Sequence, residues 1–203
     1  VIIWWITLET ESALYLSLAS FLGFTPMVIL APFAGVLVDR WSRKTLILVM
    51  DFLQALAALA LVLLFWQGIA FIWYVLALLT LRGVFQAFHA PAVSAIIPLM
   101  VPKERLSRIN GLNYLCTGVI TLLGPVVAAL LLGFWQIHQI LWIDVATFVL
   151  ALIPLVMIAI PSVRRELEKT SFKEDFLEGF NFIKNARGLL PLLICLLYTS
   201  DAA

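Results

Sequence analysis

Long apolar runs without charge are the feature that most limits how this chain can fold. The 27 residues from Ser12 to Val38 contain no Asp, Glu, Lys or Arg. This run exceeds the roughly 20 apolar residues that a helix needs to cross the hydrocarbon core of a bilayer. Hydrophobic residues make up 64% of the chain, so too little polar sequence remains to cover a surface that faces water. The pattern predicts an all-α membrane protein.

Turn signals divide the apolar sequence into a set of membrane spans. Gln67-Gly68, the polar group at 102–105 and the residues around Gly133 mark breaks between apolar runs. Residues 1–160 are therefore predicted to form an N-terminal six-helix bundle whose first helix is truncated. The predicted spans are a partial helix at 1–8 and full spans at 12–38, 46–66, 70–90, 109–133 and 139–160.

The rest of the chain has a different character. Residues 161–188 are polar, and in SFKEDFLEGFNFIK apolar residues recur at helical spacing. This pattern predicts a cytoplasmic linker with an amphipathic helix that lies on the membrane face. Residues 189–203 are predicted to begin a second bundle with a seventh helix. The last part of this segment, CLLYTSDAA at 195–203, resembles a translated sequencing adapter, and we expect it to be artefactual.

The basic residues predict an orientation in the membrane. The loops near 9–11, 67–69 and 134–138 contain no Lys or Arg, whereas the alternate loops are basic. Because cytoplasmic loops carry an excess of Lys and Arg, we expect the basic loops to be cytoplasmic. The net charge of +1 gives no reason to expect a nucleic-acid partner. The basic positions are Arg40, Arg43, Lys44, Lys103, Arg105, Arg108 and the cations between 164 and 187.

Arg82 is the residue that an apolar span explains least. At 1.5 Å per residue it lies about 15 Å into the predicted span, near the middle of a hydrocarbon core of about 30 Å. An Arg keeps its charge there, so it must face a wet cavity or a carboxylate. Two roles remain open, namely coupling or substrate binding in a central cavity and a purely structural ion pair.

Three further ionisable residues lie within the predicted spans. Asp144 is a candidate for proton coupling, and the alternative is an interfacial, hydrogen-bonded carboxylate. Asp51 is close in sequence to the basic residues of 40–44, and we expect it to pair with them. His89 could take up a proton, but a single His near an interface is more often structural.

Other patterns argue against an enzyme. No HExxH, GxSxG, P-loop or Rossmann pattern occurs in the sequence, and the missing P-loop argues against ATP as the energy source. Cys116 and Cys195 lie in apolar runs without CxxC spacing, so we expect them to be small buried apolar residues. We therefore expect neither a cofactor nor a metal site.

The charged loop after the second span resembles the signature loop of the major facilitator superfamily. GVLVDRWSRK, residues 35–44, follows the family pattern G-x-L-A-D-R-x-G-R-[RK], with Ser42 where Gly is usual. The resemblance implies a gating motif in which Asp39 and its basic neighbours stabilise one closed state by contacts with the other half of the protein. Gly35 would permit close helix packing. The matching residues are Gly35, Leu37, Asp39, Arg40, Arg43 and Lys44.

Two weaker motifs agree with this resemblance. Arg82 falls where the family carries an Arg in helix four, although Phe85-Gln86 departs from the usual Gln-Gly that follows. Gly124-Pro125 resembles the helix-five motif G-x-x-x-G-P-x-x-G-G of antiporters and exporters, although other Gly positions of the motif are not kept. Within a span, Pro kinks the helix and small residues let neighbouring helices approach closely.

Several segments, LVDRW and FHAPAVSA among them, are similar to bacterial drug and macrolide efflux permeases of this superfamily. The resemblance implies a twelve-helix monomer of two six-helix halves in the bacterial cytoplasmic (inner) membrane, with this chain as its N-terminal half. It implies proton-coupled, secondary active efflux of a hydrophobic or amphipathic drug-like compound. The expected partners are the lipid bilayer, the substrate, protons and the C-terminal half. The alternatives are a siderophore exporter, a lipid transporter and a non-transporting membrane scaffold or sensor.

Overall fold

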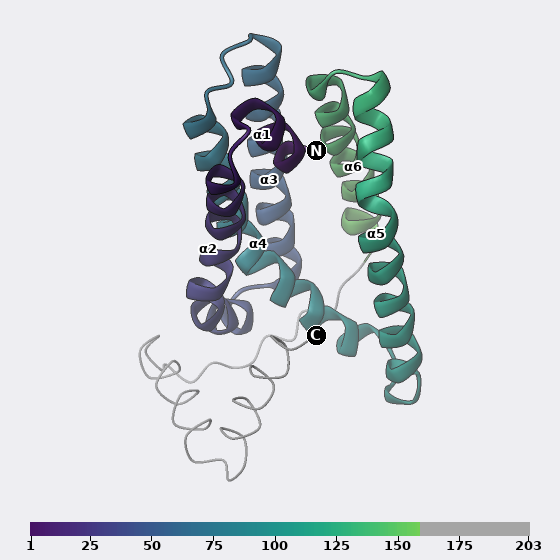
Figure 1. Ribbon diagram of the computed structural model, residues 1–203. Helices are drawn as coiled ribbons and strands as arrows, with labels where there is room; N and C mark the ends of the chain where they lie inside the picture. Colours follow the sequence, from purple (N-terminus) through teal and green to yellow (C-terminus); the bar gives the residue numbers. More distant parts are fainter. Residues whose placement is uncertain (159–203) are drawn as a thin grey trace. The chain divides into compact units, whose positions relative to one another are not determined.

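The computed structural model describes residues 1–158, apart from the side chain of Asp39. The predicted linker helix at 161–188 and the predicted start of a second bundle at 189–203 lie outside the described residues. Within the described part every regular element is helical, so the predicted all-α class is confirmed. Figure 1 shows the helices in chain order: α1 (Ile2–Thr10), α2 (Ala13–Arg40), α3 (Arg43–Trp66), α4 (Ile72–Met100), a 3-10 turn η1 (Lys103–Arg105), α5 (Leu106–Phe134) and α6 (Ile137–Met157).

The helices α2 to α6 are each long and apolar enough to cross a membrane. They follow one another through short connections, so successive spans run in opposite directions (Figure 1). The end of α2, the start of α3, the end of α4 and the end of α6 therefore meet at one end of the bundle. We call it the basic end, because Arg40, Arg43 and Lys44 lie there.

Helix α4 continues for ten residues beyond position 90, where the sequence predicted the span to end. Pro91 and Pro98 both lie inside this helix. Each Pro removes one backbone hydrogen bond, which usually favours a break. Here Ala92 and Ile96 pack into an apolar cluster at the basic end, and this tertiary contact keeps the segment helical. Their partners in the cluster are Val38, Leu46 and Ile47.

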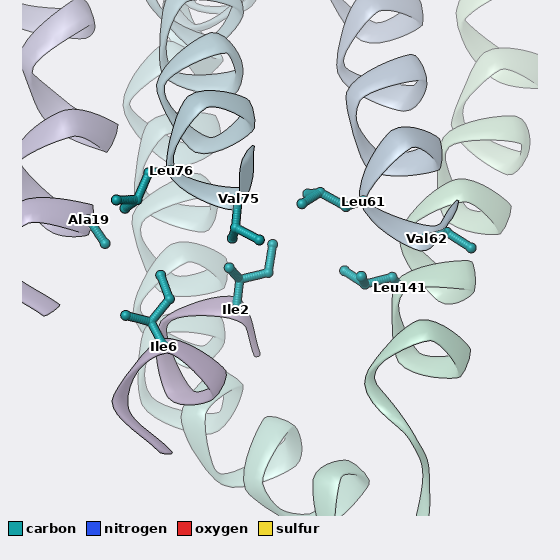
Figure 2. Packing of buried hydrophobic residues seen from close by; sticks show 8 residues of the cluster. All are labelled: Ile2, Ile6, Ala19, Leu61, Val62, Val75, Leu76 and Leu141. Atoms are coloured by element: carbon teal, nitrogen blue, oxygen red, sulfur yellow. The ribbon is translucent and has the colours of Figure 1, made fainter. Parts of the chain in front are cut away.

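A second apolar cluster lies at the opposite end of the bundle. Figure 2 shows its buried side chains, which come from α1, α2, α3, α4 and α6. Burial of each large aliphatic side chain stabilises the fold by about 1.5–3 kcal/mol relative to exposure to water. The gain is smaller relative to exposure to lipid, which is itself apolar. The two clusters leave the middle of the bundle to polar residues. The cluster consists of Ile2, Ile6, Ala19, Leu61, Val62, Val75, Leu76 and Leu141.

Helices α2 and α4 approach each other closely at a glycine. A Cβ atom added to Gly83 would overlap the backbone carbonyl oxygen of Gly23 and would lie 3.5 Å from Cγ of Pro26. At Gly35, where the motif suggested close packing, nothing within the described residues lies within 4 Å of an added Cβ. Of these two glycines, only Gly83 lies at a close helix contact, and no motif singled it out.

Helix α5 is the least packed span of the described chain. It has no buried residue, and nothing described lies within 4 Å of a Cβ added at Gly124. Pro125 lies inside the helix. Cys116 is also on α5 and is exposed, so the expected burial of this Cys is wrong for the described part. An apolar residue in a span can face either lipid or protein, and the sequence alone does not distinguish the two.

Candidate functional site

Arg82 and Asp144 form an ion pair in the middle of the bundle. The guanidinium Nη2 of Arg82 donates a hydrogen bond to Oδ2 of Asp144 at 2.9 Å. Their side chains are 26% and 44% exposed, respectively. Such a charge-assisted hydrogen bond is about twice as strong as a neutral one, and each charge offsets the cost of placing the other in an apolar span.

The ion pair lines two cavities. One cavity of about 290 Å³ is formed by α3, α4 and α6, and it extends from the pair towards the basic end, where Asp51 and Ala151 line it. We call it the basic-end cavity. The other, of about 460 Å³, is also lined by the pair and extends the opposite way, past Leu79 and Ile140. The Arg82–Asp144 pair therefore lies between the two cavities.

The basic-end cavity follows directly from helical periodicity. Helix α3 contributes Asp51, Gln54, Ala55 and Ala58, and α6 contributes Asp144, Thr147, Phe148 and Ala151. Both sets follow the spacing i, i+3, i+4, i+7, which puts each set on one face of its helix. Alanines on these faces leave space where larger side chains would fill it. The register of two apolar helices thus produces a polar, hollow centre.

Asp51 contacts His89 across the interface of α3 and α4. Oδ1 of Asp51 and Nε2 of His89 are 3.0 Å apart, and each side chain is 22% exposed. The expected pairing of Asp51 with the basic residues of 40–44 is therefore wrong, because Asp51 contacts His89 instead. Lys44 is seven residues from Asp51, a rise of about 10 Å along the helix, and its ammonium group points elsewhere.

The signature loop ties three helices together at the basic end. Arg43 donates from Nη1 to the carbonyl oxygen of Ala95 on α4 at 2.9 Å. The ammonium of Lys44 donates to the carbonyl oxygens of Val156 and Ile158 at 2.9 and 2.7 Å, respectively. The last carbonyls of a helix have no partner within it and carry partial negative charge, so Lys44 acts as a cap for α6.

Ser42, which stands where the family pattern has Gly, has a local structural role. It is the N-cap of α3, and its hydroxyl oxygen accepts a hydrogen bond from the backbone N–H of Thr45 at 3.2 Å. Ser is among the preferred N-cap residues and Gly is only slightly less favourable there. Arg40 is half-buried at the end of α2, while the side chain of Asp39 is outside the described structure. The loop thus fixes the starts and ends of helices around the site.

The described residues contain no group of three His, Cys, Asp or Glu side chains placed to hold a metal ion. The polar centre instead consists of one ion pair, one Asp–His pair and the amide and hydroxyl of Gln54 and Thr147. These groups can donate and accept hydrogen bonds. They are not arranged as a nucleophile with its general base.

An apolar helical bundle with an ion pair between two cavities is the arrangement expected of a membrane transport protein. The sequence profile of the Major Facilitator Superfamily matches residues 1–201. A match over nearly the whole chain shows that it belongs to this superfamily of transporters. The resemblance drawn from the signature loop is confirmed.

Characterised relatives point in the same direction. The chain is 34% identical over 195 residues to macrolide efflux protein A of Streptococcus pyogenes, covering 95% of the chain and 48% of the relative. It is 34% identical to macrolide efflux protein A of Enterococcus faecalis, covering 90% of the chain and 57% of the relative. It is 26% identical to the multidrug resistance protein MdtG of Proteus mirabilis, covering 92% and 44%. The chain spans about half the length of these relatives. No solved structure matches it significantly.

Proposed function

We propose that this chain is the N-terminal half of a proton-coupled exporter of hydrophobic or amphipathic drug-like compounds, with macrolides as the first class to test. The observation that carries the proposal is the Arg82–Asp144 pair between two cavities in the bundle. The similarity to macrolide efflux proteins supports the substrate class. The absence of a P-loop from the sequence favours an ion gradient over ATP.

The ion pair gives a physical means of coupling. While Asp144 is charged, it holds Arg82 and satisfies both charges in an environment of low dielectric constant. A proton on Asp144 removes that attraction and frees Arg82 to face either cavity or a polar group of the substrate. Because charges are costly in an apolar span, this change shifts the balance between conformations that are close in energy. Alternating access would then proceed by rocking of two halves about a midplane site.

The signature loop supports a gating role at the basic end. Arg43 and Lys44 hold α4 and α6 by their backbone carbonyls, so a movement of the loop moves the ends of both helices. We infer that Asp39 and Arg40, together with Gly35, take part in contacts with the other half in one closed state. The bias of Lys and Arg supports a cytoplasmic position for this end, and we propose a monomeric transporter in the bacterial inner membrane.

The experiment compares intact transporter variants in proteoliposomes. Uptake of radiolabelled erythromycin is measured with and without an imposed pH gradient. Arg82→Gln is expected to lower gradient-driven transport at least about a hundredfold, because a neutral amide cannot replace the ion pair. Arg108→Gln, which neutralises an exposed Arg at the basic end, is the matched control and is expected to transport normally.

Two results would overturn the proposal. One is an absence of erythromycin transport by the wild-type protein under either pH gradient. The other is full gradient-driven transport by Arg82→Gln, which would make the ion pair purely structural.

A further inference from the structure

The Asp51–His89 pair stands next to the ion pair but is not part of it. Asp51 lines the same basic-end cavity as Arg82 and Asp144. His89 lies seven residues after Arg82, which is about two turns further along the same face of α4. The pair therefore lies between the Arg82–Asp144 pair and the basic end. The proposed transport cycle assigns it no role so far.

The charges at the centre of the bundle do not balance. Among the described residues away from the helix ends, the charged groups are Asp51 on α3, Arg82 on α4 and Asp144 on α6, and residues 16–38 of α2 contribute no ionisable side chain. With neutral His89 the sum is one positive and two negative charges, a surplus of one negative charge. An uncompensated charge in a partly buried site is costly. One bound proton removes the surplus.

The contact with Asp51 indicates which atom of His89 would take this proton. Nε2 of His89 lies 3.0 Å from the carboxylate, so it is the nitrogen that carries hydrogen in the neutral ring. The other nitrogen, Nδ1, is buried and has no hydrogen-bond partner among the described residues. Its lone pair is therefore unpaired within the described structure, and the Asp51 carboxylate lies beside the ring that would carry the added proton.

We propose that the Asp51–His89 pair is a proton-binding site of the transporter. When a proton bonds to Nδ1, His89 becomes a cation that neutralises Asp51. The attraction between Asp51 and Arg82 is then weak, so Arg82 stays paired with Asp144. Loss of the proton leaves Asp51 competing with Asp144 for Arg82 across the shared cavity. A proton bound to the Asp51–His89 pair thereby stabilises the Arg82–Asp144 pair. This role rests on the proposed function for its link to transport, whereas the proton site itself does not.

The proton site can be tested on the chain itself. The 203-residue protein is prepared in lipid nanodiscs with ¹⁵N-labelled His. A His138→Gln background leaves His89 as the single labelled ring, because the sequence has 2 His. The nitrogen shifts are expected to show hydrogen on Nε2 alone at alkaline pH, and on both ring nitrogens after acidification.

Asp51→Asn tests the carboxylate, and its side chain keeps an oxygen that can accept the hydrogen bond. At the pH where His89 is half protonated in the parent, the protonated fraction is expected to fall from one half to about one tenth. Glu104→Gln makes the same chemical change at an exposed carboxylate in η1 and is expected to leave the fraction unchanged. A ring that stays neutral down to pH 5, or an unaltered fraction in Asp51→Asn, would overturn the proton site.

The link to transport is tested in the intact protein with His89→Gln. The Gln amide can still donate to Asp51, but it does not take up a proton. Erythromycin accumulation driven by a pH gradient is compared with erythromycin exchange without a gradient. The ratio of the two is expected to fall more than about tenfold, whereas a purely structural His would leave the ratio unchanged.

The two arms fail in different ways. If the wild-type protein does not transport erythromycin, the proposed function fails, and the nitrogen shifts still decide whether His89 binds a proton. If transport is driven by the pH gradient and His89→Gln keeps the parental ratio, the proton site is not coupled and this inference fails alone.

Discussion

Helix α4 makes two contacts of opposite character. Towards α2 it presents Gly83, whose backbone lies so close to Gly23 that no side chain fits between them. Towards α3 and α6 it presents Arg82 and His89, which meet carboxylates beside a cavity. The first contact depends on shape and has little freedom to change. The second depends on charge and can change with protonation while its helices stay in place.

This difference indicates which part of the bundle is fixed and which part is adjustable. A close backbone contact behaves as a rigid joint, because moving either helix requires both to move. An ion pair beside a cavity has room for an alternative arrangement of its side chains. We therefore expect α2 and α4 to move as one unit, with changes of state arising at the α3–α4–α6 contact.

The largest effect on stability is expected from breaking the ion pair on one side only. Asp144→Ala leaves Arg82 charged and unpaired, and it should lower the free energy of unfolding by about 2–3 kcal/mol. A buried pair would lose about 3–5 kcal/mol, but these side chains are partly exposed. Adding Arg82→Met removes the remaining charge, so the double variant should recover at least half of the loss.

The measurement is unfolding by sodium dodecyl sulfate in mixed micelles, followed by tryptophan fluorescence. A double variant that is less stable than Asp144→Ala alone would show that Arg82 is held by contacts other than Asp144. In that case the α3–α4–α6 contact would be fixed by shape, like the α2–α4 contact.

The sequence predicted one half of this ion pair more readily than the other. Arg82 requires a partner because it cannot lose its charge within an apolar span, and this need follows from chemistry alone. Asp144 is 62 residues away, so its selection as that partner depends on how α4 and α6 pack. For Asp51 the nearest charges in sequence suggested the wrong partner. Helix packing places His89 on α4 next to Asp51, whereas Lys44 is seven residues away along α3.

The length that a span needs could be predicted, because it follows from the thickness of a bilayer. The packing of Gly83 could not be predicted, because a Gly in a span looks the same whether it faces lipid or another backbone. The exposure of α5 was unpredictable for the same reason. Periodicity would have revealed the cavity faces of α3 and α6, where small and polar residues repeat at i, i+3, i+4 and i+7.

The second prediction tests the rigid joint at Gly83. Gly83→Ala should lower the free energy of unfolding by about 1–2 kcal/mol, because the new methyl group overlaps a backbone carbonyl that cannot move without its helix. Gly23→Ala is the matched control at the same crossing, because a Cβ there has nothing within 4 Å. It should be neutral or slightly stabilising, since Ala favours a helix by about 1 kcal/mol over Gly. Equal losses in both variants, in the same unfolding assay, would contradict an asymmetric contact.

The smallest effect is expected at the loop that links the two kinds of contact. Lys44→Met keeps the aliphatic stem but removes the ammonium that caps α6 at Val156 and Ile158. The loss should be about 1 kcal/mol and local, so amide hydrogen exchange in the last turn of α6 should become about fivefold faster. Lys103→Met, at an exposed Lys of η1, should leave that turn unchanged. If exchange rises equally in α2 and α6, Lys44 supports the whole basic end, and the rigid and adjustable contacts are not independent there.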